Sequence, residues 1–137
     1  MARLKARSLE PQYVGDSVGA YYGKPKEDIL AGSIVVVTDL ASSYFVVEKA
    51  TNQSIRKSSG LLYIARHASD AGRTMLLAPV HILPYAGDKK LKDGEAVWLG
   101  RNREWTFNQP KQRAIQVGRV LGSGDSVNIL LAPQGRY

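Results

Sequence analysis

The residues best suited to metal binding or catalysis in this sequence are two histidines, His67 and His81, and no cysteine accompanies them. The histidines lie far apart in the chain and match neither the HxH nor the HExxH spacing of metal sites. The lack of cysteine excludes disulfides, thiolate zinc sites and thiol catalysis. The sequence therefore predicts neither a metal nor a cofactor.

His67, Ser69 and Asp70 are close together in the chain and have the residue types of a hydrolytic triad. A triad also needs an exposed, activated nucleophile, and nothing around Ser69 resembles a nucleophile elbow. The acidic residues are scattered, without a close pair for acid–base chemistry or Mg²⁺. We therefore expect no catalytic residues and a protein that is not an enzyme.

The stretch GSGD, with Gly122, Gly124 and Asp125, could form either a phosphate-binding loop or a turn. A phosphate loop needs a helix after the glycines, because the backbone N–H groups at its first turn hold the anion. Here an alternating strand-like run, SVNILLA, follows instead. We predict a hairpin turn in which both glycines have positive φ and Asp125 bonds to nearby backbone.

Cations alternate with aromatic residues at Arg101, Arg103, Trp105 and Phe107. On a strand, this spacing puts all four side chains on one face. Such a face suits stacking of single-stranded nucleic acid and equally suits docking of a protein. Trp98 and Trp105 could also be core residues. The net charge of +7 favours a polyanionic partner, although it also fits solubility alone.

The sequence around these residues predicts short strands that are separated by turns containing Gly, Asp and Ser. β-Branched and aromatic residues dominate runs such as SIVVVTDL, YFVVEKA, LLYIARHA, EAVWLG and RAIQVGRVL. The sequence predicts an all-β fold, a small barrel or sandwich, with at most one short helix over 69–77. Pro79 and Pro84 are expected to restrict strand pairing to sheet edges. Residues 28–37 resemble 90–99, which fits either a duplicated hairpin or two ordinary strands that follow a glycine.

The N-terminal segment 1–30 differs from the rest, with several Pro and Gly and no visible helical or strand period. We expect two parts, an extended N-terminal arm over 1–30 and a β-rich core over 31–137. Tyr13, Tyr21 and Tyr22 suggest an arm that docks on a partner, and a loosely ordered terminus is the alternative. No signal peptide or membrane-spanning apolar run is visible, so a soluble protein is expected.

The second half of the chain resembles the capsid cement, or head decoration, proteins of tailed bacteriophages. In that family a Gly-plus-acid turn opens a strand ending in a Val-aromatic pair, a later strand carries a glycine between apolar residues, and a GD turn leads to the last strand. The corresponding residues are Asp93, Gly94, Val97 and Trp98, then Val117, Gly118, Val120 and Leu121, then Gly124, Asp125, Val127 and Ile129. The similarity extends over about residues 28–134.

The resemblance implies a protein that binds the outside of an assembled phage head, bridges neighbouring major capsid subunits and resists internal DNA pressure. Its location would be the virion surface after synthesis in the host cytoplasm, and self-association as a trimer is expected by analogy alone. The expected shell contacts are arm residues Arg3, Lys5, Arg7, Tyr13, Tyr21 and Tyr22, with a second surface at Arg101, Arg103 and Trp105. The alternative function is binding of single-stranded nucleic acid by a small basic β-barrel.

Overall fold

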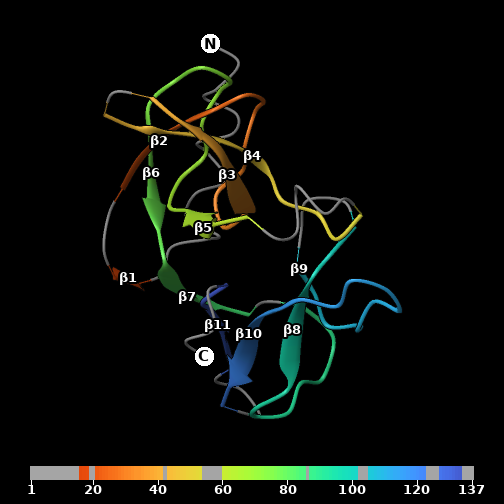
Figure 1. The fold of residues 1–137 in the computed structure, drawn as a ribbon. Helices are drawn as coiled ribbons and strands as arrows, with labels where there is room; N and C mark the ends of the chain where they lie inside the picture. The colour runs from red at the N-terminus through yellow and green to blue at the C-terminus, as the bar shows by residue number, and fades with distance from the viewer. Residues whose placement is uncertain are drawn as a thin grey trace.

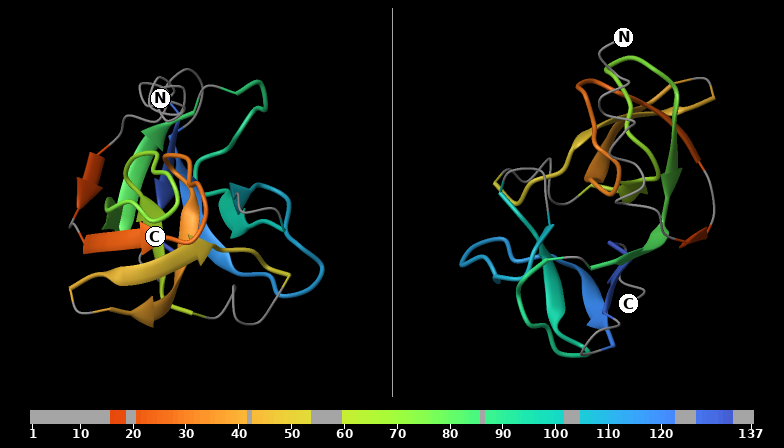
Figure 2. Two further views of the ribbon diagram at one scale, coloured as in Figure 1. Left: turned by 90° about the horizontal axis from the view of Figure 1, so that it is seen from above. Right: turned by 180° about the vertical axis from the view of Figure 1, so that it is seen from behind.

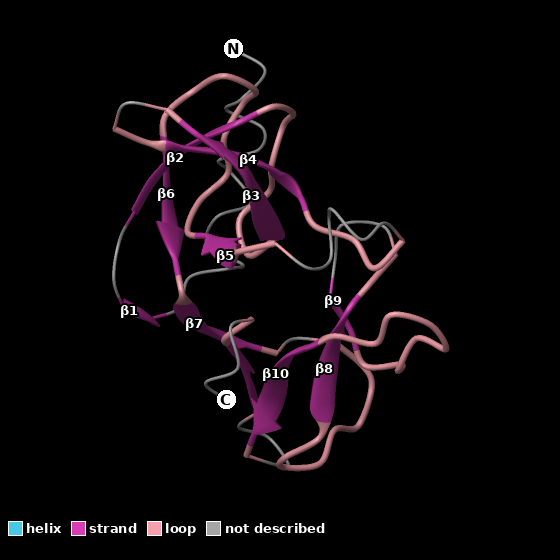
Figure 3. Cartoon of the chain, in the orientation of Figure 1, coloured by secondary structure: helices cyan, strands magenta, loops and turns pink. Residues whose placement is uncertain are grey.

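The computed structural model describes residues 16–18, 21–41, 43–53, 60–85, 87–101, 105–122 and 127–133. This part of the chain contains β-strands and no helix, and hence no helix that could span a membrane (Figure 3). The predicted all-β class is therefore confirmed. The strands are β1 (Asp16–Val18), β2 (Tyr21–Pro25), β3 (Ile34–Leu40), β4 (Phe45–Lys49), β5 (Leu62–Ala65), β6 (Met75–Ala78), β7 (Val80–Pro84), β8 (Ala96–Leu99), β9 (Trp105–Thr106), β10 (Gln116–Leu121) and β11 (Asn128–Leu131).

The strands form a closed barrel and a second, curled sheet. The barrel has the order β2-β4-β3-β5-β6, and the second sheet has the order β1-β7-β11-β10-β8-β9. Figure 1 shows the barrel above the second sheet, and Figure 2 shows the same arrangement from above and behind. Only Pro79 separates β6 from β7, so the chain passes directly from the barrel into the second sheet. Contrary to expectation, β7 is not an edge strand, because it pairs with both β1 and β11.

Two hydrophobic cores follow from the alternation of side chains along the barrel strands. On β3, Val35 and Val37 face the barrel interior, where they pack with Met75 and Leu77 of β6. Ile34 and Val36 face the other way, into a larger core shared with the second sheet. β3 is thus apolar on both faces because each face covers a different core, which explains its continuous run of β-branched residues.

Three turns of one kind precede β3, β6 and β8. Each has a glycine with positive φ at its third position, Gly32 (82°), Gly72 (79°) and Gly94 (86°). In each, the fourth residue's N–H donates to the first residue's carbonyl oxygen: Ser33 to Leu30 at 3.2 Å, Arg73 to Asp70 at 3.1 Å and Glu95 to Lys92 at 3.0 Å. A positive φ at this position favours glycine. The resemblance between 28–37 and 90–99 reflects this shared turn.

The barrel also contains a structural repeat, which relates segment 21–37 to segment 61–77. Gly32 N–H donates to the Ala65 carbonyl at 2.8 Å, and Gly72 N–H donates to the Pro25 carbonyl at 2.7 Å. Ile29 and Ser69, which are equivalent positions of the two segments, exchange backbone hydrogen bonds with each other. The two segments therefore occupy equivalent places. The sequence did not reveal this repeat, because only Ala-Gly, at 31–32 and 71–72, is identical between them.

The sequence allowed at most one short helix, over 69–77, and the structure has none there. Ser69 forms a β-bridge, residues 71–72 form a turn, and β6 begins at Met75. Gly72 adopts a positive φ that a right-handed helix does not allow. Met75 and Leu77 are buried in the barrel at the two-residue period of a strand.

The predicted N-terminal arm over 1–30 also differs where the structure describes it. Asp16–Val18 pairs with β7, and Tyr21–Pro25 is a barrel strand between β4 and β6. Ile29 is buried inside the barrel. Residues 21–30 are therefore part of the folded body, while residues 1–15 and 19–20 lie outside the described residues.

His67 holds the chain between β5 and β6 through both ring nitrogens. Nδ1 lies 2.8 Å from the Ala68 carbonyl oxygen and donates to it, while Nε2 accepts from the Leu76 N–H at 3.0 Å.

We predict that His67→Ala lowers the free energy of unfolding by about 1–3 kcal/mol, because it leaves the Leu76 N–H without its acceptor. Urea unfolding followed by circular dichroism measures this change. The exposed neighbour supplies the control, since Arg66→Ala should change stability by less than about 0.5 kcal/mol. Equal unfolding midpoints for the two variants would contradict this role.

Candidate functional site

One end of the barrel is closed by aromatic rings. Tyr21 of β2 lies 5.1 Å from the ring centroid of Tyr63 and 6.2 Å from that of Phe45. Phe45 and Tyr63 stack on each other at 5.6 Å. All three occupy inner-face positions of their strands, because Tyr21 pairs with the inward-facing Leu77 and Tyr63 pairs with Val35, while Phe45 packs against the barrel core. The rings fill the barrel interior at this end and fix its shape.

A β-bulge adds a leucine to this aromatic end. Val37 pairs with Val47, but the next pair along the ladder is Asp39 with Val46, so Thr38 is the extra residue. After the bulge the alternation of β3 is reversed, and Leu40 pairs with Phe45. Leu40 consequently lies on the side of β3 that faces the barrel end, although its side chain is 69% exposed.

Leu61 completes an apolar cluster at this end, which we call the mouth patch (Tyr21, Leu40, Phe45, Leu61 and Tyr63). Its exposed members are Tyr21, Leu40 and Leu61. Leu61 lies opposite Val37, whose N–H donates to the Leu61 carbonyl at 2.9 Å. Tyr21 and Leu61 are each 44% exposed, and Tyr63 is buried beneath them. Large apolar side chains gathered at one place on a surface typically mark an interaction site.

The predicted arm anchors Tyr21 and Tyr22 lie on opposite faces of β2. Tyr22 is 61% exposed on the outer face of the barrel, next to Lys24 along the same strand face. The Lys24 amino group sits 4.6 Å from the ring centroid of Tyr44. The structure therefore gives the two tyrosines separate surfaces. The other predicted arm contacts, Arg3, Lys5, Arg7 and Tyr13, lie outside the described residues.

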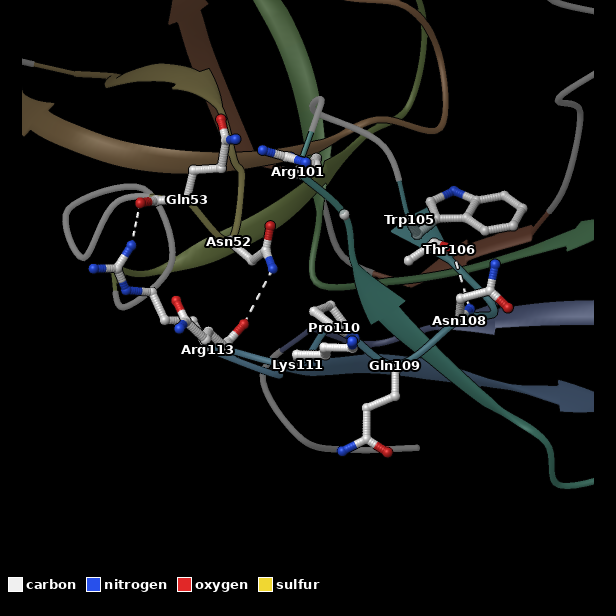
Figure 4. Close-up of a pocket in the computed structure, with 12 residues that line it drawn as sticks. Asn52, Gln53, Arg101, Trp105, Thr106, Asn108, Gln109, Pro110, Lys111 and Arg113 are labelled. Atoms are coloured by element: carbon white, nitrogen blue, oxygen red, sulfur yellow. Dashed lines mark hydrogen bonds between the residues drawn. The ribbon is translucent and has the colours of Figure 1, made fainter.

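A second candidate site is an open polar cleft of about 970 Å³ between the barrel and the second sheet (Figure 4). Residues 52–53, which follow barrel strand β4, form one wall, and the loop after β9 forms the other. The described lining consists of Asn52, Gln53, Gly100, Arg101, Trp105, Thr106, Asn108, Gln109, Pro110, Lys111, Gln112 and Arg113. None of these residues is acidic.

Gln53 holds two guanidinium groups at the edge of this cleft. With its amide oxygen turned toward Arg101, that oxygen accepts from Nε and Nη2 of Arg101, both at 3.0 Å. The backbone carbonyl of Gln53 accepts from Nη1 of Arg113 (Figure 4). Arg113 has a φ of 51°, which is uncommon for a residue other than glycine. The backbone of Arg113 is therefore strained at the position where its side chain bonds to Gln53.

Asn52 joins the two walls of the cleft. Its backbone N–H donates to the Gly100 carbonyl at 3.0 Å, and its Nδ2 donates to the Gln112 carbonyl at 3.2 Å. Its Oδ1 is buried and has no hydrogen-bond partner among the described residues. The bonds from Asn52 to Gly100 and Gln112 connect the barrel to the second sheet, and they therefore fix the distance between the two walls of the cleft.

The predicted cation–aromatic face is only partly formed. Arg101 and Trp105 both line the cleft and so belong to one surface, as predicted. Arg103 lies outside the described residues. Phe107 is not on the strand, because β9 ends at Thr106. Its ring packs edge-to-face against Trp105 and Tyr85, each at 5.6 Å, on the margin of the larger core. The prediction of four side chains on one strand face was therefore wrong, because the chain turns after Thr106.

The GSGD segment joins two paired strands, as predicted for a hairpin turn. β10 and β11 are antiparallel, and their pairing runs to Leu121 opposite Asn128. Gly122 has a φ of 85°, and its N–H donates to Oδ1 of Asp93 at 2.8 Å. Gly122 is thus held by an acidic residue from the turn before β8. Gly124 and Asp125 lie outside the described residues.

The histidine-containing segment does not assemble a triad among the described residues. The His67 ring bonds to the backbone of Ala68 and Leu76, and Ser69 Oγ bonds to the backbone carbonyls of Asp70 and Arg73. His81 is buried in β7. In the described ranges, no group of three or more His, Asp or Glu side chains is placed to hold a metal ion.

A scan of the chain against protein-family models found no match, and a search of curated proteins found no significant relative.

Proposed function

We propose that this chain is a non-enzymatic cement protein that binds the outer surface of an assembled phage head. It would bridge neighbouring major capsid subunits and stabilise the shell against internal DNA pressure. The resemblance in residues 28–134 suggests this function. The structural observation that supports this function is the mouth patch, because Leu40, Tyr21 and Leu61 are exposed there at one end of a closed barrel. We place the shell-binding surface at this patch.

The mouth patch suits docking on a preformed shell because a closed barrel holds it. Its aromatic rings already contact one another, so little conformational entropy is lost when a partner covers them. Partial burial of each leucine adds a modest amount of binding free energy. A shell carries many equivalent sites, and binding that requires the assembled shell stabilises it by mass action.

Bridging requires contacts on more than one side of the protein. Tyr21 and Tyr22 are both exposed, and they lie on opposite faces of β2. The net charge of +7 would speed encounter with an acidic outer shell. Together these surfaces support a protein that contacts two subunits at once.

Co-sedimentation tests this function directly. We expect the purified protein to pellet with empty expanded phage shells, to saturate at a fixed ratio to shell subunits, and to remain bound at moderate salt. Saturation matters because nonspecific attachment of a basic protein would continue to rise and would be lost as salt screens it. Shells that carry the bound protein should also remain closed at a temperature at which shells without it open.

A fluorescent single-stranded oligonucleotide in the same salt series tests the alternative. Oligonucleotide binding with a steep salt dependence, without shell binding, would replace the cement function with nucleic-acid binding. Binding to neither partner would reject both.

A further inference from the structure

The cleft between the barrel and the second sheet carries positive charge that its described surroundings do not neutralise. Arg101, Lys111 and Arg113 line it, and none of the lining residues that the structure describes is acidic. Three ion pairs between described residues involve other lysines: Lys26 with Glu48, Lys49 with Glu27 and Lys89 with Glu95. Clustered cations without a carboxylate partner favour an anionic ligand.

The cations are also partly fixed before any ligand arrives. Arg101 and Arg113 both bond to Gln53, which occupies some of their N–H donors and leaves others for a ligand. Because a neutral amide holds them, their charge is not cancelled. A guanidinium held in this way can meet a carboxylate with little loss of side-chain entropy.

Side-chain amides outnumber the cations in the cleft. The lining includes five of them, Asn52, Gln53, Asn108, Gln109 and Gln112, together with the Thr106 hydroxyl. Each amide carries both donors and acceptors, and so does each hydroxyl of a sugar. Simple phosphate recognition calls for donors alone, so this lining matches a ligand with many hydroxyl groups better than a bare anion.

Trp105 provides the apolar part of the cleft. Its indole is half-buried, and an edge-to-face contact with Phe107 at 5.6 Å and 72° fixes the ring. A fixed aromatic surface beside hydrogen-bonding groups can pack against the C–H face of a sugar ring. It is the only aromatic residue in the described lining, whereas a single-strand binding groove uses successive aromatic rings.

We infer that this cleft binds a carboxylated oligosaccharide. Arg101, Lys111 and Arg113 would contact the carboxylate, the side-chain amides of Asn108, Gln109 and Gln112 would contact hydroxyls, and Trp105 would pack against a sugar ring. The inference does not depend on shell binding, because the mouth patch and the cleft share no residue.

Titration calorimetry on the full chain tests the inference. The probe is a hexasaccharide of alternating glucuronic acid and N-acetylglucosamine, and its matched control is the same hexasaccharide with the carboxylates reduced to alcohols. We expect the acidic hexasaccharide to bind saturably. The reduced hexasaccharide should bind at least about tenfold more weakly, because it cannot form charge-assisted hydrogen bonds.

Two lysine variants separate the cleft from general charge. Lys111→Ala and Lys90→Ala each remove one positive charge, but only Lys111 lines the cleft, and Lys90 is exposed in the loop before β8. Lys111→Ala should weaken binding of the acidic hexasaccharide about fivefold or more, while Lys90→Ala should change it less than about twofold. Melting curves of both variants check that they remain folded.

Four results would overturn the inference. They are no binding of the acidic hexasaccharide, equal binding of the reduced one, equal weakening by the two lysine variants, and tighter binding of a single-stranded oligonucleotide or an acidic peptide than of the saccharide. The last result would assign the cleft to that other class of ligand.

Discussion

Gly118→Ala should prevent the chain from folding or leave it only marginally stable. A Cβ on Gly118 would lie 2.0 Å from the Leu130 carbonyl oxygen and 3.2 Å from Leu131 Cα. Both are backbone atoms of β11, the strand that pairs with β10 at this point, so no side-chain rotation relieves the clash. We expect a loss of more than about 3 kcal/mol, a large part of the stability of a domain of this size.

Gly94→Ala is the matched control for this effect. Gly94 has a φ of 86°, but nothing lies within 4 Å of an added Cβ. The same substitution should therefore cost only the backbone strain of a left-handed residue, about 1–2 kcal/mol. Guanidinium unfolding of both variants, or soluble yield where Gly118→Ala does not fold, measures the difference. If Gly118→Ala were as stable as Gly94→Ala, the close approach of β10 and β11 would be disproved.

Replacing the two exposed leucines of the mouth patch should nearly abolish shell binding. The double variant Leu40→Asp and Leu61→Asp removes apolar contact area and places charge where the partner surface would have to be desolvated. We expect affinity for expanded shells to fall about 100-fold or more. Because the two side chains are 69% and 44% exposed, the free protein should keep its fold. Co-sedimentation at fixed shell concentration measures the loss.

The control for this variant carries the same change in charge at another place. Thr74→Asp and Ala114→Asp are also exposed positions, outside the mouth patch, and either double variant lowers the net charge from +7 to +5. Normal shell binding by the control and loss by the leucine variant would assign binding to the mouth patch. Equal behaviour of the two would show that the mouth patch is not the contact, even if the wild-type chain binds shells.

The strands of the second sheet and their turns were largely predictable, because their signals are local. Val97 and Leu99 alternate with half-buried neighbours, as a strand with one covered face should. Gly94 and Gly122 marked turns, and both have the positive φ that such positions need. The glycine within β10 has a steric reason that only the packed structure gives, namely the nearby backbone of β11.

Closure of the barrel was not predictable, because β2 combines two tyrosines, which favour strands, with Gly, Lys and Pro, which disfavour them. Its sequence YYGKP contains no β-branched residue. An added Cβ on Gly23 would lie 2.7 Å from Leu77 Cδ1 of the adjacent strand β6, so glycine lets the Leu77 side chain pack over β2 without a shift. Tertiary packing therefore outweighs local preference in this segment.

The candidate sites were predictable only where a single segment supplies the residues. Arg101 and Trp105 were recognisable from their spacing, and both line the cleft. Gln53 and Arg113 were not, since a contact between residues so distant in the chain leaves no pattern in the sequence. Leu40 was missed for a related reason, because its direction depends on a bulge at Thr38 that reverses the alternation of β3.

The repeat within the barrel has a consequence for how the protein folds on the ribosome. β2 pairs with β6 and β3 pairs with β5, so the first repeat segment completes its hydrogen bonds only with the second. Tyr21 pairs with Leu77 of β6, which is synthesised only after β3, β4 and β5. Such a high contact order slows folding, and the N-terminal segment cannot fold as an independent unit during synthesis. Emergence of β6, rather than of the first strands, should therefore start productive barrel formation.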